Sequence, residues 1–234
     1  MMLLRYSALC LLTILTAVGC ASTTVTDRQA YEGARLPRPD RILVYDFAAS
    51  AADLPAGYVV PQYGPPSTPP TQQQLEAGRQ LGAQVAKELI GELRGVGLPA
   101  VPAAGQPAPR LNDIVLIGYF QSIDKGQLAE RTVLGFGAGA TELKTVVEAY
   151  RMTAAGLVRL GAGDVSDAGS KAPGEAMPLA IAVASGNPIG LIVSSAAKVE
   201  GEASGRTTIE GAAKRTAQEI GTQLKGAAQR QGWI

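Results

Sequence analysis

The sequence contains no histidine, and this absence narrows the chemistry that the protein can perform. Histidine is the commonest general base and the commonest metal ligand in proteins. Ser-His-Asp and Cys-His catalysis are therefore both excluded. The only cysteines are Cys10 and Cys20, so a zinc site would have to rely on carboxylates. We expect a protein that is not an enzyme and that has no metal and no cofactor.

Aromatic residues are also scarce, at 5% of the chain, and neither sign of charge is in excess. The 21 lysines and arginines against 20 acidic residues give a formal net charge of +1. Binding of nucleic acid normally requires a basic face, so we expect no nucleic-acid partner. Aromatic side chains dominate many binding hot spots, and their scarcity beside 28 glycines favours close packing of the backbone.

The most informative stretch is the beginning, MMLLRYSALCLLTILTAVGC. Arg5 is the only charged residue before Asp27, and a short apolar core over residues 9–18 follows it. A positive start, a short apolar core and small residues before a cut are typical of a secretory signal. A core of this length is too short to cross a bilayer, because a spanning helix needs about 20 residues.

The segment Ala17-Val18-Gly19-Cys20 resembles the bacterial lipobox, although Ala17 replaces the usual leucine. The resemblance implies that residues 1–19 are removed and that Cys20 is acylated, which anchors the chain stably to a membrane. No aspartate follows Cys20, and in lipoproteins this favours the outer membrane, facing the periplasm. The alternative is an ordinary signal peptide that contains a cysteine. Loss of Cys10 and acylation of Cys20 would leave no intrachain disulfide.

Residues 20–40 are mostly polar, and we interpret them as a tether to a single globular domain over residues 41–230. The nearly continuous apolar run from Ile42 to Phe47 predicts a strand buried on both faces. The proline-rich segment 51–70 predicts a surface loop. Residues 71–74 have the pattern of a capping box, and apolar residues at helical spacing then predict an amphipathic helix that ends at Gly97.

The rest of the chain predicts further strands and a second helix. A short strand is expected over 98–101, and Ile114 to Phe120 is typical of a strand, with Gly118 marking a bulge or a close backbone approach. Residues 141–153 and 157–161 predict a hairpin, and Thr207-Thr208 precede a second amphipathic helix. We therefore expect an α/β (α+β) fold, with a single mixed sheet and two amphipathic helices packed on it.

A Gly/Ala-rich apolar segment over residues 178–199 separates the hairpin from the second helix. Its length is close to that of a membrane span, but Asn187-Pro188 at its centre favours a break. It packs either in the core, or between copies through its small residues, or it inserts into a membrane.

A glycine-rich stretch, from Gly135 to Gly139, satisfies the loose dinucleotide pattern G-x-G-x-x-A. That pattern binds pyrophosphate only between a strand and a helix, whereas ELKTVVEAY after it is typical of a strand. We therefore interpret Gly135, Phe136, Gly137 and Gly139 as a possible interaction loop rather than a nucleotide site.

Taken with the first strand Val44-Tyr45-Asp46-Phe47, the stretch GFGAGATEL gives the chain a family resemblance. The chain resembles a bacterial lipoprotein family known only as a domain of unknown function, DUF4410, over roughly residues 38–228. That family has no established activity, so the resemblance implies no catalytic residue. The order of elements is more distantly similar to modules of envelope assembly proteins, including the N-terminal domain of the Tol–Pal translocation protein and the curli secretion lipoprotein.

Three hypotheses follow for the function. The first is an outer-membrane lipoprotein that acts as an accessory or assembly component and binds another envelope protein or its own copies. The second is a periplasmic small-ligand-binding protein or an enzyme of envelope metabolism, for which Asp46, Asp124 and Glu142 would line a deep pocket. The third is a ring-forming secretion component that assembles through residues 178–199.

Overall fold

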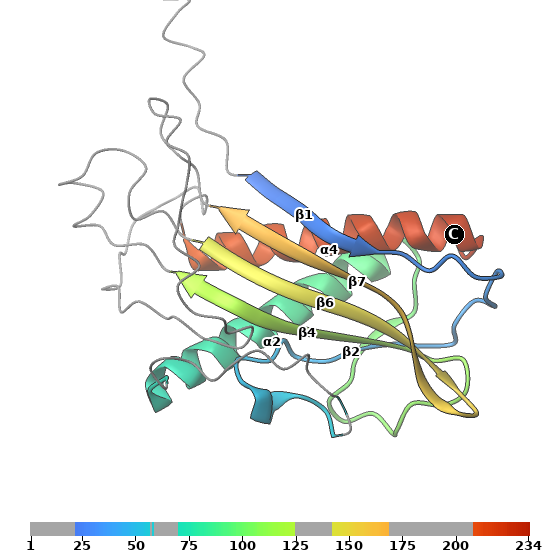
Figure 1. The fold of residues 1–234 in the computed structure, drawn as a ribbon, viewed down its shortest axis with the longest axis horizontal. Helices are drawn as coiled ribbons and strands as arrows, with labels where there is room; N and C mark the ends of the chain where they lie inside the picture. The colour runs from blue at the N-terminus through green and yellow to red at the C-terminus, as the bar shows by residue number, and fades with distance from the viewer. Residues whose placement is uncertain (1–21, 57, 59–69, 125–141, 169–207) are drawn as a thin grey trace, which may run out of the picture.

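A computed structural model describes residues 22–56, 58, 70–124, 142–168 and 208–234. These residues form one six-stranded mixed sheet, and two long helices cover one of its faces (Figure 1). The predicted fold class, a single mixed sheet with two amphipathic helices, is confirmed. The Gly/Ala-rich segment 178–199 lies outside the described residues.

The sheet combines a parallel part and an antiparallel part. The parallel strands β2 and β3 lie at one end, and β2 also pairs in parallel with β4. From β4 onward every neighbouring pair is antiparallel, because β6 and β7 form a hairpin and β1 adds to its outer edge. The order across the sheet is β1-β7-β6-β4-β2-β3. The strands are β1 (Ser22–Gln29), β2 (Ile42–Val44), β3 (Ala100–Pro102), β4 (Ile114–Asp124), β6 (Glu142–Thr153) and β7 (Gly156–Ala168).

The first long helix, α2 (Gln72–Gly95), begins where the capping box predicts. The Gln74 backbone N–H donates to Thr71 Oγ1 at 3.2 Å, and the Thr71 N–H donates to Gln74 Oε1 at 2.8 Å. These two bonds satisfy amide groups that have no partner within the helix. Gly97 follows the last turn with a φ of 84°, a conformation that glycine adopts without strain. A short 3-10 helix, η1 (Ala51–Asp53), precedes α2.

The second long helix, α4 (Ile209–Gln231), is capped by Thr208, whose hydroxyl accepts the Gly211 N–H at 3.1 Å. It ends at Gly232, with a φ of 74°. The two helices touch closely at Gly221, where an added Cβ would lie 2.9 Å from the Cβ of Glu92. This contact fixes α4 against α2 while both pack on the sheet (Figure 1).

The core lies between the helices and the sheet, and Phe47 occupies its crowded centre. The Phe47 ring lies 6.1 Å from that of Phe120 and fills the space where a Cβ on Gly118 would stand, at 2.2 Å. Gly118 was expected to mark a bulge or a close approach, and the close approach is what occurs. The irregularity in β4 falls further along, between Phe120 and Ser122.

The structure corrects the expected tether over part of its length. Residues 22–29 form β1, which pairs with β7 from Ser22 opposite Ala168 onward. The strand is polar and mostly exposed because it lies at the edge of the sheet, so its sequence lacks the apolar alternation that marks a strand with a buried face. A bulge after Thr26, where Asp27 has a φ of 48°, interrupts the pairing.

In the part of the chain that the structure describes, no helix is both long enough and apolar enough to span a membrane.

Candidate functional site

Several residues that the sequence singled out lie outside the described residues. These are the proposed lipidation residue Cys20 and the possible interaction loop with Gly135, Phe136, Gly137 and Gly139. The element after that loop is described, and it is the strand β6. The helix that a dinucleotide site requires at this point is therefore absent, as the sequence predicts.

The three carboxylates proposed to line a deep pocket do not converge. Asp124 and Glu142 are opposite partners in the β4–β6 ladder. Asp46 is exposed and lies elsewhere, because Ala48 bridges to Tyr119, five residues before Asp124 in β4. Asp46 lies two residues before Ala48 and so further from Asp124, and at about 3.3 Å per residue the two are separated by roughly 20 Å along the strand. The second hypothesis is corrected here, because the three carboxylates do not line one pocket. Glu142 pairs instead with Lys144 at 3.2 Å.

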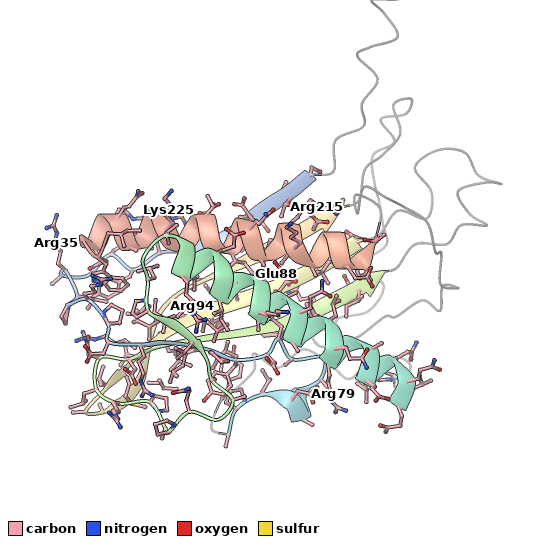
Figure 2. All side chains as sticks on the ribbon, turned by 180° about the vertical axis from the view of Figure 1, so that it is seen from behind. Arg35, Arg79, Glu88, Arg94, Arg215 and Lys225 are labelled. Carbon is pink, nitrogen blue, oxygen red and sulfur yellow. The ribbon has the colours of Figure 1, made fainter. Side chains whose placement is uncertain are left out.

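Among the described residues, the most completely buried carboxylate is that of Asp167, on β7, with 0% of its surface exposed. It accepts hydrogen bonds from Arg215 Nε at 2.8 Å and Arg215 Nη2 at 2.6 Å, and from Thr23 Oγ1 at 2.5 Å. The guanidinium approaches in a two-pronged geometry that matches the carboxylate. Figure 2 shows Arg215 on α4, toward the end at which β1 begins. These contacts join β1, β7 and α4.

A second buried charge, Asp113, holds the start of β4. Its carboxylate pairs with Arg41, just before β2, and accepts the Arg110 backbone N–H at 2.8 Å. Because β2 and β4 are parallel neighbours, this pair fixes where both strands begin.

A polar cluster lies on the sheet face opposite the helices. Glu148 is 4% exposed and accepts the Tyr150 hydroxyl at 3.0 Å, while Arg159 Nε lies 3.3 Å from its other oxygen. Burial, and then the neighbouring Glu148 carboxylate, raise the pKa of Tyr150 well above its ordinary value, so the phenol remains a donor. Tyr58 packs edge-on against Tyr150, with ring centroids 5.9 Å apart. The cluster joins two strands and the segment before α2.

The β6–β7 hairpin ends in an exposed apolar surface that we call the hairpin end, formed by Leu111, Leu157 and Val158. Their exposed fractions are 64%, 45% and 47%, whereas most large apolar side chains described here are buried. Leu111 belongs to this end because the next residue donates its N–H to Met152, the register partner of Leu157. Leu157 and Val158 are successive residues of β7, so the hairpin end exposes apolar side chains on both faces of the sheet. Exposed apolar side chains gathered at one end of a sheet are candidates for contact with a partner.

An apolar cavity of about 150 Å³ lies between the sheet and the C-terminal half of α4. Its floor is made by β7 and β6, and its roof by α4 and the end of α2. Small residues on both sides, Gly161 and Gly163 on β7, Ala149 on β6 and Ala227 on α4, leave the space open. Arg28 and Arg230 contribute charge to the lining.

A protein-family model matches the central part of the chain. The model described as a domain of unknown function (DUF4410) matches residues 42–186, more than half of the chain. The chain belongs to the DUF4410 family. The match runs from β2 through β7 and leaves β1 and α4 outside it, so the walls that these two elements give to the cavity lie beyond the matched range.

Among solved structures, a PelC dodecamer from Paraburkholderia phytofirmans is similar at a TM-score of 0.42 and 13% identity, covering 87% of this chain and 98% of that chain. A variant PelC dodecamer from the same organism is similar at a TM-score of 0.37 and 15% identity, covering 66% and 85%. Likeness at this level says nothing about function or assembly. No curated protein matches the chain.

Sequence reasoning about this DUF4410 protein missed Asp167, Arg215 and the cavity. An acid in a strand of alternating polar residues resembles any solvent-facing acid, and only its partner on α4 distinguishes it. The cavity left a weak trace, the small residues Gly161 and Gly163 on β7, but their facing walls are far away in the sequence.

Proposed function

We propose that this protein is an outer-membrane lipoprotein, acylated at Cys20 and facing the periplasm. It acts there as a non-enzymatic accessory or assembly component that binds another envelope protein or its own copies. The apolar run that ends at Gly19-Cys20 supports the anchor, and the absence of histidine supports a role without catalysis. The observation that carries the binding role is the exposed hairpin end.

The position of the hairpin end fits presentation to a partner. Cys20 comes two residues before Ser22, which pairs with Ala168 at the last position of β7. The hairpin end lies at the other end of the same strand (Figure 1). At about 3.3 Å per residue, the two ends of β7 are roughly 40 Å apart. A lipid at one end would therefore hold the apolar surface away from the membrane, where another protein can reach it.

Strand addition at the sheet edges is a less suitable mode of contact. On one edge, β1 is bulged after Thr26 and carries Asp27. On the other edge, β3 is three residues long and ends in Pro102, which has no N–H to donate. Bulges, charges, proline and short length are the features by which edge strands avoid pairing with other chains. Contact through the side chains of the hairpin end is therefore the favoured mode.

Residue-specific photo-crosslinking in intact cells tests this function. A photoreactive residue replaces Leu157, and a matched control places it at Lys87, an exposed position on α2. We expect a discrete adduct from position 157 and none from position 87. An adduct of twice the chain mass identifies a second copy, and any other defined mass identifies another envelope protein.

Two further arms separate the anchor from the contact. With Cys20→Ala, we expect loss of the membrane fraction and of the adduct. With Leu157 photoreactive and Val158→Ser, we expect a weaker adduct from a chain that stays in the membrane. Equal adducts from positions 157 and 87, or none at 157 in a membrane-bound chain, would contradict the binding role.

The hypothesis of a ring-forming component rests on residues 178–199, outside the described residues, and stays a prediction. The ligand-binding hypothesis is favoured by a different observation, the apolar cavity between the sheet and α4.

A further inference from the structure

We propose that the apolar cavity under α4 binds an anionic amphiphile, with a tail of about six carbons inside and its negative head at Arg28 and Arg230. A hollow of about 150 Å³ lined by aliphatic side chains accommodates a benzene-sized apolar group. This site is separate from the hairpin end and goes beyond the proposed function.

Most of the side chains that line the cavity are apolar. Ile114 and Leu116 of β4 and Val147 of β6 line the sheet side, and Leu224 of α4 and Leu93 of α2 line the helix side. Water is held in a protein interior by several polar partners, and these five aliphatic side chains offer none. An apolar tail would contact the aliphatic side chains of the wall and would leave no polar group without a hydrogen-bond partner.

Of the two glycines of β7 that line the cavity, Gly161 is required by the backbone, because an added Cβ would meet the Gln29 carbonyl oxygen at 2.5 Å, whereas Gly163 is not. At Gly163 an added Cβ would meet only Val25 Cγ1, at 3.6 Å, which is ordinary van der Waals contact. A Cβ therefore fits at this position, so the close packing of the backbone does not require glycine there. Voids lower stability in proportion to their volume. Filling the void from position 163 would therefore raise the stability of the fold, yet the residue there is glycine. A cavity that binds a ligand has to stay open in this way.

The polar groups of the lining gather where β1 ends and α4 ends. Arg28 lies near the end of β1, and Arg230 lies in the last turn of α4. Both are exposed, and neither forms an ion pair with an acidic residue in the described parts of the chain. Arg35 lies beside the same end of α4 (Figure 2), and Glu32 is the one acid between residues 30 and 36. The surplus of positive charge favours an anionic head group.

The segment from residue 30 to 36 closes this end and is held by α4. The Leu36 N–H donates to Gln231 Oε1 at 2.7 Å, and Trp233 Nε1 donates to the Leu36 carbonyl at 3.0 Å. Tyr31, Leu36 and Trp233 all line the cavity. Two hydrogen bonds therefore hold the aromatic and aliphatic groups that would cover the tail.

Trp233 also supplies the assay, because it is the only tryptophan in the chain and it lines the cavity. Bromine quenches tryptophan fluorescence at contact, so 6-bromohexanoate is the probe. The full-length chain with Cys20→Ala is titrated, which excludes any lipid carried by its own cysteine. We expect saturable quenching, and an affinity that falls about fourfold for each methylene removed from the tail.

The head group and the tail are tested separately. Uncharged 6-bromohexanol should bind more weakly than the carboxylate, and Arg28→Gln or Arg230→Gln should each weaken only carboxylate binding, by about threefold. Lys87→Gln, the matched change on exposed α2, should change nothing. A bromohexyl phosphate is compared with the carboxylate probe to identify the preferred anionic head group. The preferred head group is that of the probe that quenches Trp233 at the lower concentration.

Gly163→Leu fills the cavity and should abolish quenching by all probes, whereas Gly91→Leu, on an open surface of α2, should leave it intact. If Gly163→Leu does not fold by circular dichroism, Ala227→Phe fills the space from the α4 side. The proposal is overturned if no probe quenches Trp233, if the alcohol binds as tightly as the carboxylate, or if a folded cavity-filling variant is quenched like the parent.

Discussion

Replacement of Arg215 by methionine should cost a large share of the stability of the domain. Asp167 is 0% exposed, and its carboxylate accepts three hydrogen bonds from described residues. Arg215 donates two of these three bonds. Methionine keeps most of the aliphatic stem of the arginine, so the change removes mainly the charge. A buried carboxylate that loses its partner typically costs about 3–5 kcal/mol. Domains of this size have unfolding free energies of about 5–15 kcal/mol.

The measurement is urea denaturation followed by circular dichroism, with unfolding free energies compared at constant m-value. The control is Arg79→Met, which breaks the pair of Arg79 with Asp53 at 2.6 Å. The side chain of Arg79 is 49% exposed, against 20% for that of Arg215. An exposed pair is worth at most about 1 kcal/mol, so the two variants should differ clearly.

A double-mutant cycle identifies the cause of the loss. Asp167→Leu combined with Arg215→Met replaces the ion pair with apolar groups, an exchange that is often close to neutral. We expect the double variant to recover most of the stability that Arg215→Met loses. If Arg215→Met costs no more than Arg79→Met, or if the double variant recovers nothing, the buried pair is not what holds β1 and β7 to α4.

Two further predictions use single side chains. Gly118→Ala should destabilise the protein by about 1–3 kcal/mol, because its Cβ would meet the Phe47 ring at 2.2 Å. Gly91→Ala, in open space on α2, should instead stabilise the protein by about 0.5–1 kcal/mol. Thermal unfolding compares the two variants, and equal shifts in their unfolding temperatures would contradict the close packing at Gly118. Burial, and then the neighbouring Asp27, raise the pKa of the Asp164 carboxyl. The folded protein therefore binds the carboxyl proton of Asp164 more tightly than the unfolded chain does. The stability that this proton contributes is lost as the pH rises through the pKa of the folded state. Asp164→Asn should therefore stabilise the protein by up to about 1 kcal/mol at neutral pH and have no effect well below the ordinary value of 3.8, and denaturation at both pH values checks this.

The helices illustrate how far local patterns reach. The capping residues Thr71 and Thr208, and the glycines just beyond each helix, act through groups a few residues away. Such contacts depend only on residues close together in the sequence, and the predicted helices are confirmed. The strands β2, β4 and β6 were also predictable, because burial on one or both faces leaves an apolar pattern.

The edge strand β1 shows where such patterns fail. Its residues are mostly exposed, so selection for burial leaves no periodic trace, and the segment looks like a polar linker. Its pairing with β7 is decided by hydrogen bonds of the backbone and by Thr23 reaching Asp167. For the same reason, the second predicted strand of the hairpin was too short: β7 continues to Ala168 through glycines and acids.

The sequence by itself determined the family of this protein, its fold class and the ends of its helices, because each of these depends on residues close together in the chain. It also excluded histidine-dependent chemistry. Export and anchoring at Cys20 stay predictions. Only the tertiary structure decided which acid is buried, where the apolar hairpin end points and where the cavity opens. Each of these depends on elements such as β1, β7 and α4 that are distant in the sequence and meet only when the sheet and helices pack.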